Sequence, residues 1–227
     1  MNARLCGLLY LTLKVAGVFA IGFIRLSLVV PGNAAASAHN ILASQTLWRS
    51  GFASLILLGV CYVAVALLFY SLFRPFNKTL SLLAACFSLV GVSICVGSAL
   101  GYFAPLFMLD GSASLKAFDT QQLQAIAILA IRIEAYGYHL SLVFFAAGLL
   151  CNAYLMYTSA LFPKYLAVLP AIGALSYLLS GFGLFLMPSS ELLTSPLILA
   201  PGLVAEVLFC LWLIIAGTRT TLQAYIR

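Results

Sequence analysis

The feature that most constrains the fold is a series of long apolar runs, each of roughly twenty residues or more. A helix of about 20 residues crosses the ~30 Å hydrocarbon core of a bilayer. Hydrophobic residues make up 64% of the 227 and charged residues only 7%, whereas a soluble protein carries far more charge. Because a helix satisfies its own backbone hydrogen bonds in lipid, the chain is predicted to be an all-α integral membrane protein.

Six spans can be drawn along the chain. They cover about residues 5–30, 52–73 and 79–103, a fourth run ending near Tyr157, and then 165–187 and 201–217. No composition shift or long linker divides the sequence. We therefore expect one domain, 1–227, formed by a bundle of six transmembrane helices with short loops.

The distribution of charge predicts the orientation. One side of a six-span arrangement carries seven basic residues and no acid: Arg4, Lys14, Arg74, Lys78, Lys164, Arg219 and Arg227. The other side is mixed: Arg49, Lys116, Asp110, Asp119 and Glu191. The positive-inside rule places the first side, with both termini, in the cytoplasm. We expect a multi-pass protein of the bacterial inner (plasma) membrane.

A cleaved signal peptide is the alternative reading of the N-terminus. Two basic residues, the apolar stretch 15–24 and then Ala36-Ser37-Ala38 have the order of such a segment. Arg25 interrupts that order, and a second apolar run, 5–13, precedes it. Cleavage would leave five spans and a mature N-terminus outside.

Several functional classes lack support in the sequence. It contains no HExxH, GxSxG, phosphate-binding Gly-rich loop or paired acidic motif, so no catalytic residue is assigned. The six cysteines fall in the apolar spans without a CxxC pair, and the two histidines do not match a transmembrane haem. We expect no metal and no cofactor. The basic residues are scattered, which argues against nucleic acid and leaves membrane lipids as the expected partners. A homo-oligomer or a membrane-complex partner is compatible with the sequence.

Ionisable residues inside the spans are the candidates for function or helix pairing, because they are costly in lipid. Lys14 and Arg25 are eleven positions apart and should share one face of the first span, with Lys14 snorkelling inward. Arg25 and Glu206 each lie about 8 Å from the outer end of their helix. The sequence thus predicts an Arg25–Glu206 pair, either as a structural ion pair or as part of an outward-facing polar pocket.

The fourth span is too long for one crossing. Asp119 to Tyr157 is 39 residues, about 58 Å as one helix, with Gly137 near its middle as the expected helix breaker. Either its first half projects outside, or the chain bends at Gly137. We predict the bend or a membrane boundary at that glycine.

Polar and aromatic residues lie on both sides of Gly137 in the sequence. Arg132, Tyr136 and His139 follow helical spacing and share a face, and Glu134 lies between them. An aromatic-belt boundary explains these residues. Alternatively, Arg132, Glu134 and His139 join Arg25 and Glu206 as one wall of an external polar pocket.

The first loop and two small-residue spacings concern packing. Pro31-Gly32 predicts a turn, followed by a short helix with Asn33 as its N-cap. Gly97-xxx-Gly101 and Ser176-xxx-Ser180 allow close helix approach, within the chain or between copies.

Several segments together resemble a known family. They are VVPGNAAASAHNI (29–41), LWRSG (47–51), LFRPFNKTLSLLA (72–84), YGYHLSLVFFAAGL (136–149), LFPKYLAVL (161–169) and AEVLFCLWLIIAG (205–217). In this order the chain resembles the domain of unknown function 4386 family of bacterial multi-pass membrane proteins. The family tends to have Gly-Asp where this chain has Gly32-Asn33, and an acid and a histidine near Arg132 and Glu134. The resemblance implies the fold, the membrane location and a retained first span, and it implies no activity.

The leading functional expectation is therefore a non-enzymatic accessory, binding or transport module. The alternative is a membrane-embedded enzyme acting on a lipid or lipophilic small molecule, with Glu206, Glu134 or His139 as acid or base.

Overall fold

The computed structural model describes residues 3–112, 115–159 and 161–216, and these form helices joined by short connections, with no strand among them. Six helical segments are long and apolar enough to cross a membrane: Arg4–Leu28, Gln45–Phe73, Lys78–Met108, Thr120–Thr158, Lys164–Leu186 and Leu197–Ile215. The six predicted spans and the all-α fold are confirmed. The predicted end of the last span at Gly217, and the basic residues Arg219 and Arg227, lie outside the described residues.

The first span is not a uniform α-helix. It begins as α1 (Ala3–Gly17), continues as a π-helical segment, η1 (Val18–Arg25), and ends in α2 (Leu26–Leu28). A π-helix uses wider i→i+5 hydrogen bonds, and such segments are rare and frequently found at functional sites. The predicted turn follows, with Gly32 at a positive φ of 76°. The Asn33 side chain then accepts from the Ala36 N–H at 2.9 Å and caps α3 (Ala34–Ala43), as predicted.

The second and third spans are longer than their apolar runs. α4 covers Gln45–Phe73 and α5 covers Lys78–Met108, so each extends several residues beyond its predicted outer boundary. Asn77 caps α5 by accepting from the Leu80 N–H at 2.9 Å. Pro105 lies inside the last part of α5, beyond the predicted end at Phe103.

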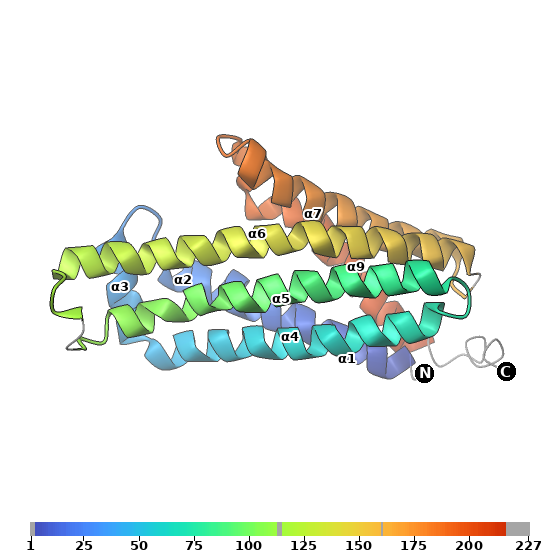
Figure 1. The fold of residues 1–227 in the computed structure, drawn as a ribbon, viewed down its shortest axis with the longest axis horizontal. Helices are drawn as coiled ribbons and strands as arrows, with labels where there is room; N and C mark the ends of the chain where they lie inside the picture. The colour runs from blue at the N-terminus through green and yellow to red at the C-terminus, as the bar shows by residue number, and fades with distance from the viewer. Residues whose placement is uncertain (1–2, 113–114, 160, 217–227) are drawn as a thin grey trace.

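The fourth span, α6 (Thr120–Thr158), is one uninterrupted helix of 39 residues. It starts at a capping box formed by Asp119 and Gln122. The predicted bend at Gly137 is wrong, because α6 is continuous through that residue, and Figure 1 shows α6 running along the whole bundle. The glycine is instead required for packing, because a Cβ there would collide with the Cβ of Ser98 on α5. Of the two readings, only the continuity of the helix is observed, and the membrane boundary at Gly137 stays a prediction.

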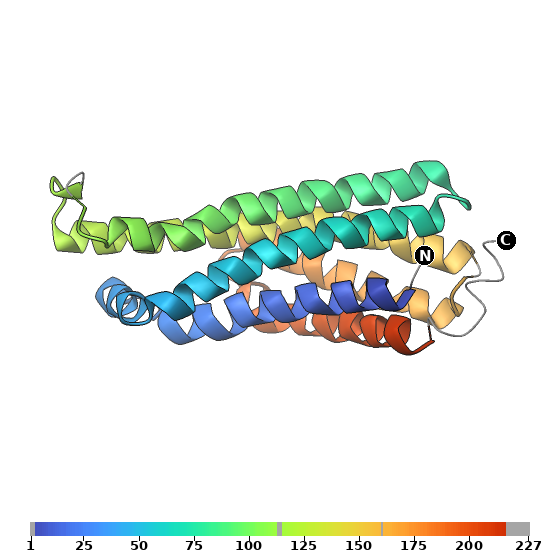
Figure 2. The same cartoon turned by 90° about the horizontal axis from the view of Figure 1, so that it is seen from below.

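The last two spans, of 23 and 19 residues, are shorter than the other four. η3 (Lys164–Ala167) leads into α7 (Val168–Leu186), and α8 (Glu191–Thr194) and η4 (Pro196–Leu199) lead into α9 (Ala200–Ala216). In Figure 1, α7 and α9 lie beside the half of α6 nearest the start of α1, and the other half of α6 extends past them. Figure 2 shows α1 and α9 side by side at that end.

Two apolar cores follow from this arrangement. The proximal core lies in the half of the bundle where α1 begins and contains Tyr10, Leu13, Phe69, Phe162 and Phe209 among others. The distal core lies towards the other end, and its buried residues are Ala20, Ile24, Leu28, Ile41, Trp48, Leu55, Ala99, Tyr102, Leu106 and Ile131. The π-helical segment belongs to the distal core.

Three of the four residues in the small-residue spacings pack against other helices of the chain. A Cβ on Gly101 would lie 2.6 Å from the backbone oxygen of Ala130, so α5 and α6 are in close contact there. Gly97, one turn away, has no atom within 4 Å of its Cβ position. Ser176 lies against Gly202 of α9, and Ser180 bonds His139 of α6.

Candidate functional site

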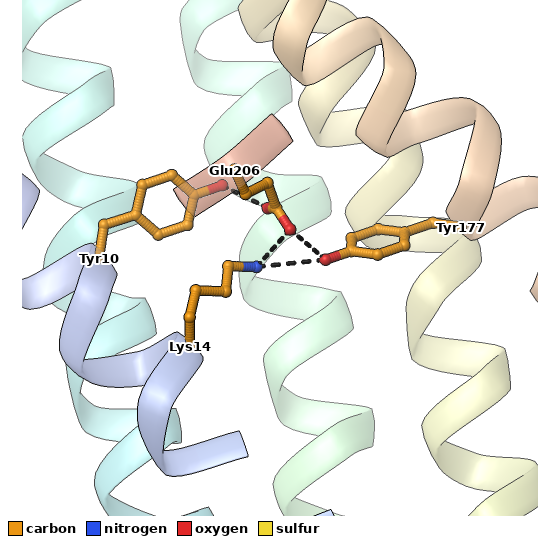
Figure 3. Close-up of polar contacts among 4 residues, drawn as sticks. All are labelled: Tyr10, Lys14, Tyr177 and Glu206. Atoms are coloured by element: carbon orange, nitrogen blue, oxygen red, sulfur yellow. Dashed lines mark hydrogen bonds and ion pairs between the residues drawn. The ribbon is translucent and has the colours of Figure 1, made fainter. Parts of the chain in front are cut away.

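The first polar cluster lies in the proximal half of the bundle and surrounds the carboxylate of Glu206 (Figure 3). Lys14 Nζ is 2.6 Å from Glu206 Oε2, and the Tyr10 hydroxyl donates to Oε1 at 2.5 Å. The Tyr177 hydroxyl also donates to Oε2, and Lys14 Nζ donates to the Tyr177 oxygen at 3.2 Å. We call these four residues the proximal cluster. It ties α1, α7 and α9 together.

The helical spacing explains how the proximal cluster forms. Tyr10 and Lys14 are four residues apart on α1, so their side chains leave the same face one turn apart. Glu206 lies in the second turn of α9, directly opposite, and its side chain is only 2% exposed. A buried carboxylate needs a charge partner and hydrogen-bond donors, and here it has one cation and two hydroxyls.

The second polar contact, the distal pair, lies in the other half of the bundle. Arg25 Nη1 at the end of η1 is 2.5 Å from Glu134 Oε2 on α6. The Glu134 side chain is 3% exposed and that of Arg25 is 20% exposed. Gly101 makes room for Glu134, because a Cβ on Gly101 would lie 3.0 Å from the Glu134 Cβ. The distal pair thus depends on the close contact of α5 with α6.

The predicted Arg25–Glu206 pair is therefore wrong: Arg25 binds Glu134, and Glu206 binds Lys14. The prediction assumed that two residues at equal distances from the outer ends of their helices lie at the same depth in the bundle. α9 has 17 residues and starts part of the way along the bundle, whereas α6 has 39. Glu206 consequently lies level with Lys14, and Arg25 lies further along, next to α6.

A cavity of about 300 Å³ lies between these two ion pairs. Its wall includes both basic side chains, Lys14 and Arg25, as expected for residues on one face of the first span. Further polar groups of the lining are Tyr62, Tyr138, His139 and Tyr177. The rest of the wall is mainly apolar. A mostly apolar cavity with a few convergent polar groups is the usual form of a small-molecule site.

The two carboxylates face elsewhere. Glu206 is in the wall of a separate small cavity of about 20 Å³, which has room for about one water molecule. Tyr10 and Asn152 also line that small space. Neither Glu206 nor Glu134 is in the lining of the larger cavity, although their basic partners are.

The other predicted site residues separate. His139 lines the cavity and its Nδ1 lies 3.1 Å from the Ser180 Oγ of α7. Arg132 and Tyr136 are exposed and are not in the lining. The structure therefore brings Arg25 and His139 to one cavity, places Glu134 and Glu206 behind it, and leaves Arg132 outside.

Sequence reasoning missed Tyr10 and Tyr177 and gave Lys14 only a snorkelling role. The i, i+4 spacing of Tyr10 and Lys14 was the available signal, because it places a donor and a cation on one helix face. Tyr177 carried no comparable signal, since its neighbours on α7 are apolar or small. Within the described residues, no group of three or more His, Cys, Asp or Glu side chains is placed to hold a metal ion.

The fold and the cavity define the class: a multi-pass α-helical membrane protein with a polar-lined cavity inside its bundle. Residues 5–217 match the family model described as Domain of unknown function (DUF4386), and the chain belongs to that family. Comparisons with curated proteins and with solved structures give no match. The family resemblance inferred from the sequence is confirmed.

Proposed function

We propose that the protein is a non-enzymatic module that binds, or carries across the membrane, a small amphipathic molecule held in the cavity between Lys14 and Arg25. The observation that carries the proposal is the cavity itself, about 300 Å³ in the membrane-spanning bundle. Its apolar wall suits a hydrocarbon portion, and its convergent polar groups suit a head group.

Access from the bilayer supports this role. Val18 and Leu26 of the first span line the cavity yet are 48% and 61% exposed, and Gly22 between them is also exposed. α1 packs against both α4 and α9, whereas η1 packs mainly against α4. The wall beside η1 therefore faces the surrounding lipid, and an amphipathic molecule can enter from the side.

The position of the carboxylates favours binding over catalysis. The enzyme alternative uses His139, which lines the cavity, or one of the two carboxylates, Glu134 and Glu206, as an acid or base within hydrogen-bond reach of a substrate. Both carboxylates are buried, bonded to a cation, and outside the cavity lining.

A cavity-filling variant tests the proposal. Gly22→Leu adds a side chain at the cavity wall, where the nearest atom to a Cβ is Val18 Cγ1 at 3.5 Å. Gly97→Leu is the matched control, because its Cβ meets open space and it is not in the lining. We expect native mass spectrometry to detect a non-covalently bound lipid or small molecule on the wild type and on Gly97→Leu, and to find it lost from Gly22→Leu. An equal amount on all three variants, or none on the wild type, would contradict the proposal.

We further propose that the protein resides in the bacterial inner membrane with both termini in the cytoplasm, on the charge distribution given above. Lys116 and Arg74 are exposed in connections at opposite ends of the bundle. Lys116→Cys should react with a membrane-impermeant maleimide on intact cells, and Arg74→Cys only after permeabilisation, with the wild type as background. The reverse pattern would overturn the orientation.

A further inference from the structure

We propose that the cavity selects amphipathic molecules with an anionic head group, carboxylate or phosphate, and that Arg25 binds that head. This inference rests on the proposed function, because it names the ligand class for the same cavity. It starts from the asymmetry of the two ion pairs. In each pair the basic side chain lines the cavity and the acidic one lies behind it.

The burial of the four side chains shows the same asymmetry. Lys14 and Arg25 are 11% and 20% exposed, and their partners Glu206 and Glu134 are 2% and 3% exposed. A molecule in the cavity therefore meets the positive end of both ion pairs. In a surrounding of low dielectric constant such oriented charges act strongly on a bound head group. A negative charge gains from both, and a positive charge is repelled by both.

The hydrogen-bonding groups of the wall point to the same class. Tyr62, Tyr138 and His139 are in the lining, and their hydroxyl or ring N–H groups can donate to an oxygen of a head group. The Tyr177 hydroxyl, also in the lining, already donates to Glu206. No Asp or Glu is in the described lining, so the wall contains no carboxylate to attract an ammonium group.

Arg25 is the better anchor of the two cations. Lys14 Nζ donates to both Glu206 and Tyr177. A guanidinium carries five N–H donors, and within the described residues Arg25 uses Nη1 for a single bond, to Glu134. The planar fork of arginine matches carboxylate and phosphate with two parallel hydrogen bonds. Arg25 can therefore bind a ligand oxygen while it keeps Glu134.

An anionic head group can belong to a free lipophilic acid or to an anionic phospholipid. Two arms of one experiment distinguish these two kinds of ligand. The first arm titrates the purified full chain in a non-ionic detergent with decanoate, decanol and decyltrimethylammonium, which share a chain length and differ in head charge. The second arm offers equimolar phosphatidic acid and phosphatidylcholine with matched acyl chains, and reads the bound lipid by native mass spectrometry.

We expect decanoate to bind at least tenfold more tightly than decanol, phosphatidic acid to be retained over phosphatidylcholine, or both. If only the first arm shows an anion preference, the ligand is a free acid. If only the second arm shows it, the ligand is a lipid. All three decyl compounds could bind equally, with no preference between the lipids, while Gly22→Leu loses this binding. That result overturns the anionic class and leaves the proposed function intact. Preference for the ammonium compound also overturns it. If neither arm detects binding, both proposals fail.

Variants at Arg25 test the anchor. Arg25→Lys keeps the charge opposite Glu134 and loses the planar fork. We expect its affinity for the anion to fall about tenfold while affinity for decanol stays unchanged. If Arg25→Lys does not fold, the double variant Arg25→Gln/Glu134→Gln removes both charges together and should lose the anion preference. An anion preference that survives in the folded variant would contradict the role of Arg25.

Discussion

The two buried ion pairs differ in how fully their carboxylates are satisfied. Glu206 in the proximal cluster receives one cation and two tyrosine hydroxyls from α1 and α7. Among the described residues, Glu134 in the distal pair receives one hydrogen bond, from Arg25. The basic partner is also more exposed in the distal pair, 20% against 11%. Both pairs join the first span to another helix, but only the proximal cluster joins three.

This difference suggests a division of roles. A fully bonded buried charge stabilises the arrangement of helices, and removing one partner leaves the survivor buried and unpaired. A cation with spare donors is available to a ligand. We therefore infer that the proximal cluster holds α1, α7 and α9 together. We infer that the distal pair is the part of the cavity wall that binds the ligand.

The largest effect is expected from breaking the proximal cluster. Glu206→Gln should lower the free energy of unfolding by about 3–5 kcal/mol, because Lys14 is left buried without its charge partner. Unfolding in mixed micelles by added dodecyl sulfate, followed by circular dichroism, measures this loss. Asp110→Asn, at an exposed loop position, is the control and should change stability by less than about 0.5 kcal/mol. A loss for Glu206→Gln no greater than the control would remove its structural role.

Breaking the distal pair should cost less. Glu134→Gln is expected to lower the free energy of unfolding by about 2–3 kcal/mol, less than the ~3–5 kcal/mol for a fully buried pair, because Arg25 is partly exposed. The same micelle titration, run beside Glu206→Gln, gives the ranking. If Glu134→Gln is the more damaging of the two, the division of roles is reversed.

A pair of glycine variants probes the distal pair through the backbone. Gly101→Ala should cost about 1–3 kcal/mol, because its Cβ meets the Ala130 oxygen and the Glu134 Cβ. Gly97→Ala, one turn away with open space, should be neutral or stabilising by up to about 1 kcal/mol. Their thermal midpoints in detergent separate the two positions. Equal shifts would mean that α5 and α6 do not meet at Gly101.

The smallest expected effect is a coupling near zero between Arg25 and Glu206. Double-mutant cycles with Gln should give about 0.5–3 kcal/mol for Lys14 with Glu206 and for Arg25 with Glu134. In the Arg25–Glu206 cycle, the stability losses of the two single variants should add to that of the double variant within about 0.3–0.5 kcal/mol, as for residues that share no partner. A coupling above about 1 kcal/mol in that last cycle would restore the pairing that we reject here.

Much of the architecture could be predicted from hydropathy and length, because lipid allows few alternatives to a spanning helix. The cap at Asn33 was also predictable, since it depends on neighbouring residues. The continuity of α6 was not predictable, because the sequence shows Gly137 only as a possible helix breaker. Its contact with Ser98, which requires a glycine, is visible only in the structure. A glycine in a span can serve a bend or a close contact, and only the packing partner distinguishes the two.

The candidate site was predictable in its residue types and not in its pairings. Arg25, Glu134 and Glu206 stood out as charges in apolar helices. Which carboxylate meets which cation depends on the relative depth of α6 and α9, which is set by how the helices pack. The π-helical turns of η1, which carry Arg25 along the cavity, had no sequence signal that we could identify.

A density map of the full chain in lipid nanodiscs is the most direct test of the central claim, that two separate ion pairs hold their cations at one ligand cavity. We expect Lys14 on Glu206, Arg25 on Glu134, and an elongated non-protein density between the two cations with its head at the Arg25 guanidinium. A map with Arg25 against Glu206, or with η1 packed onto α9 so that the cavity is closed, would contradict it.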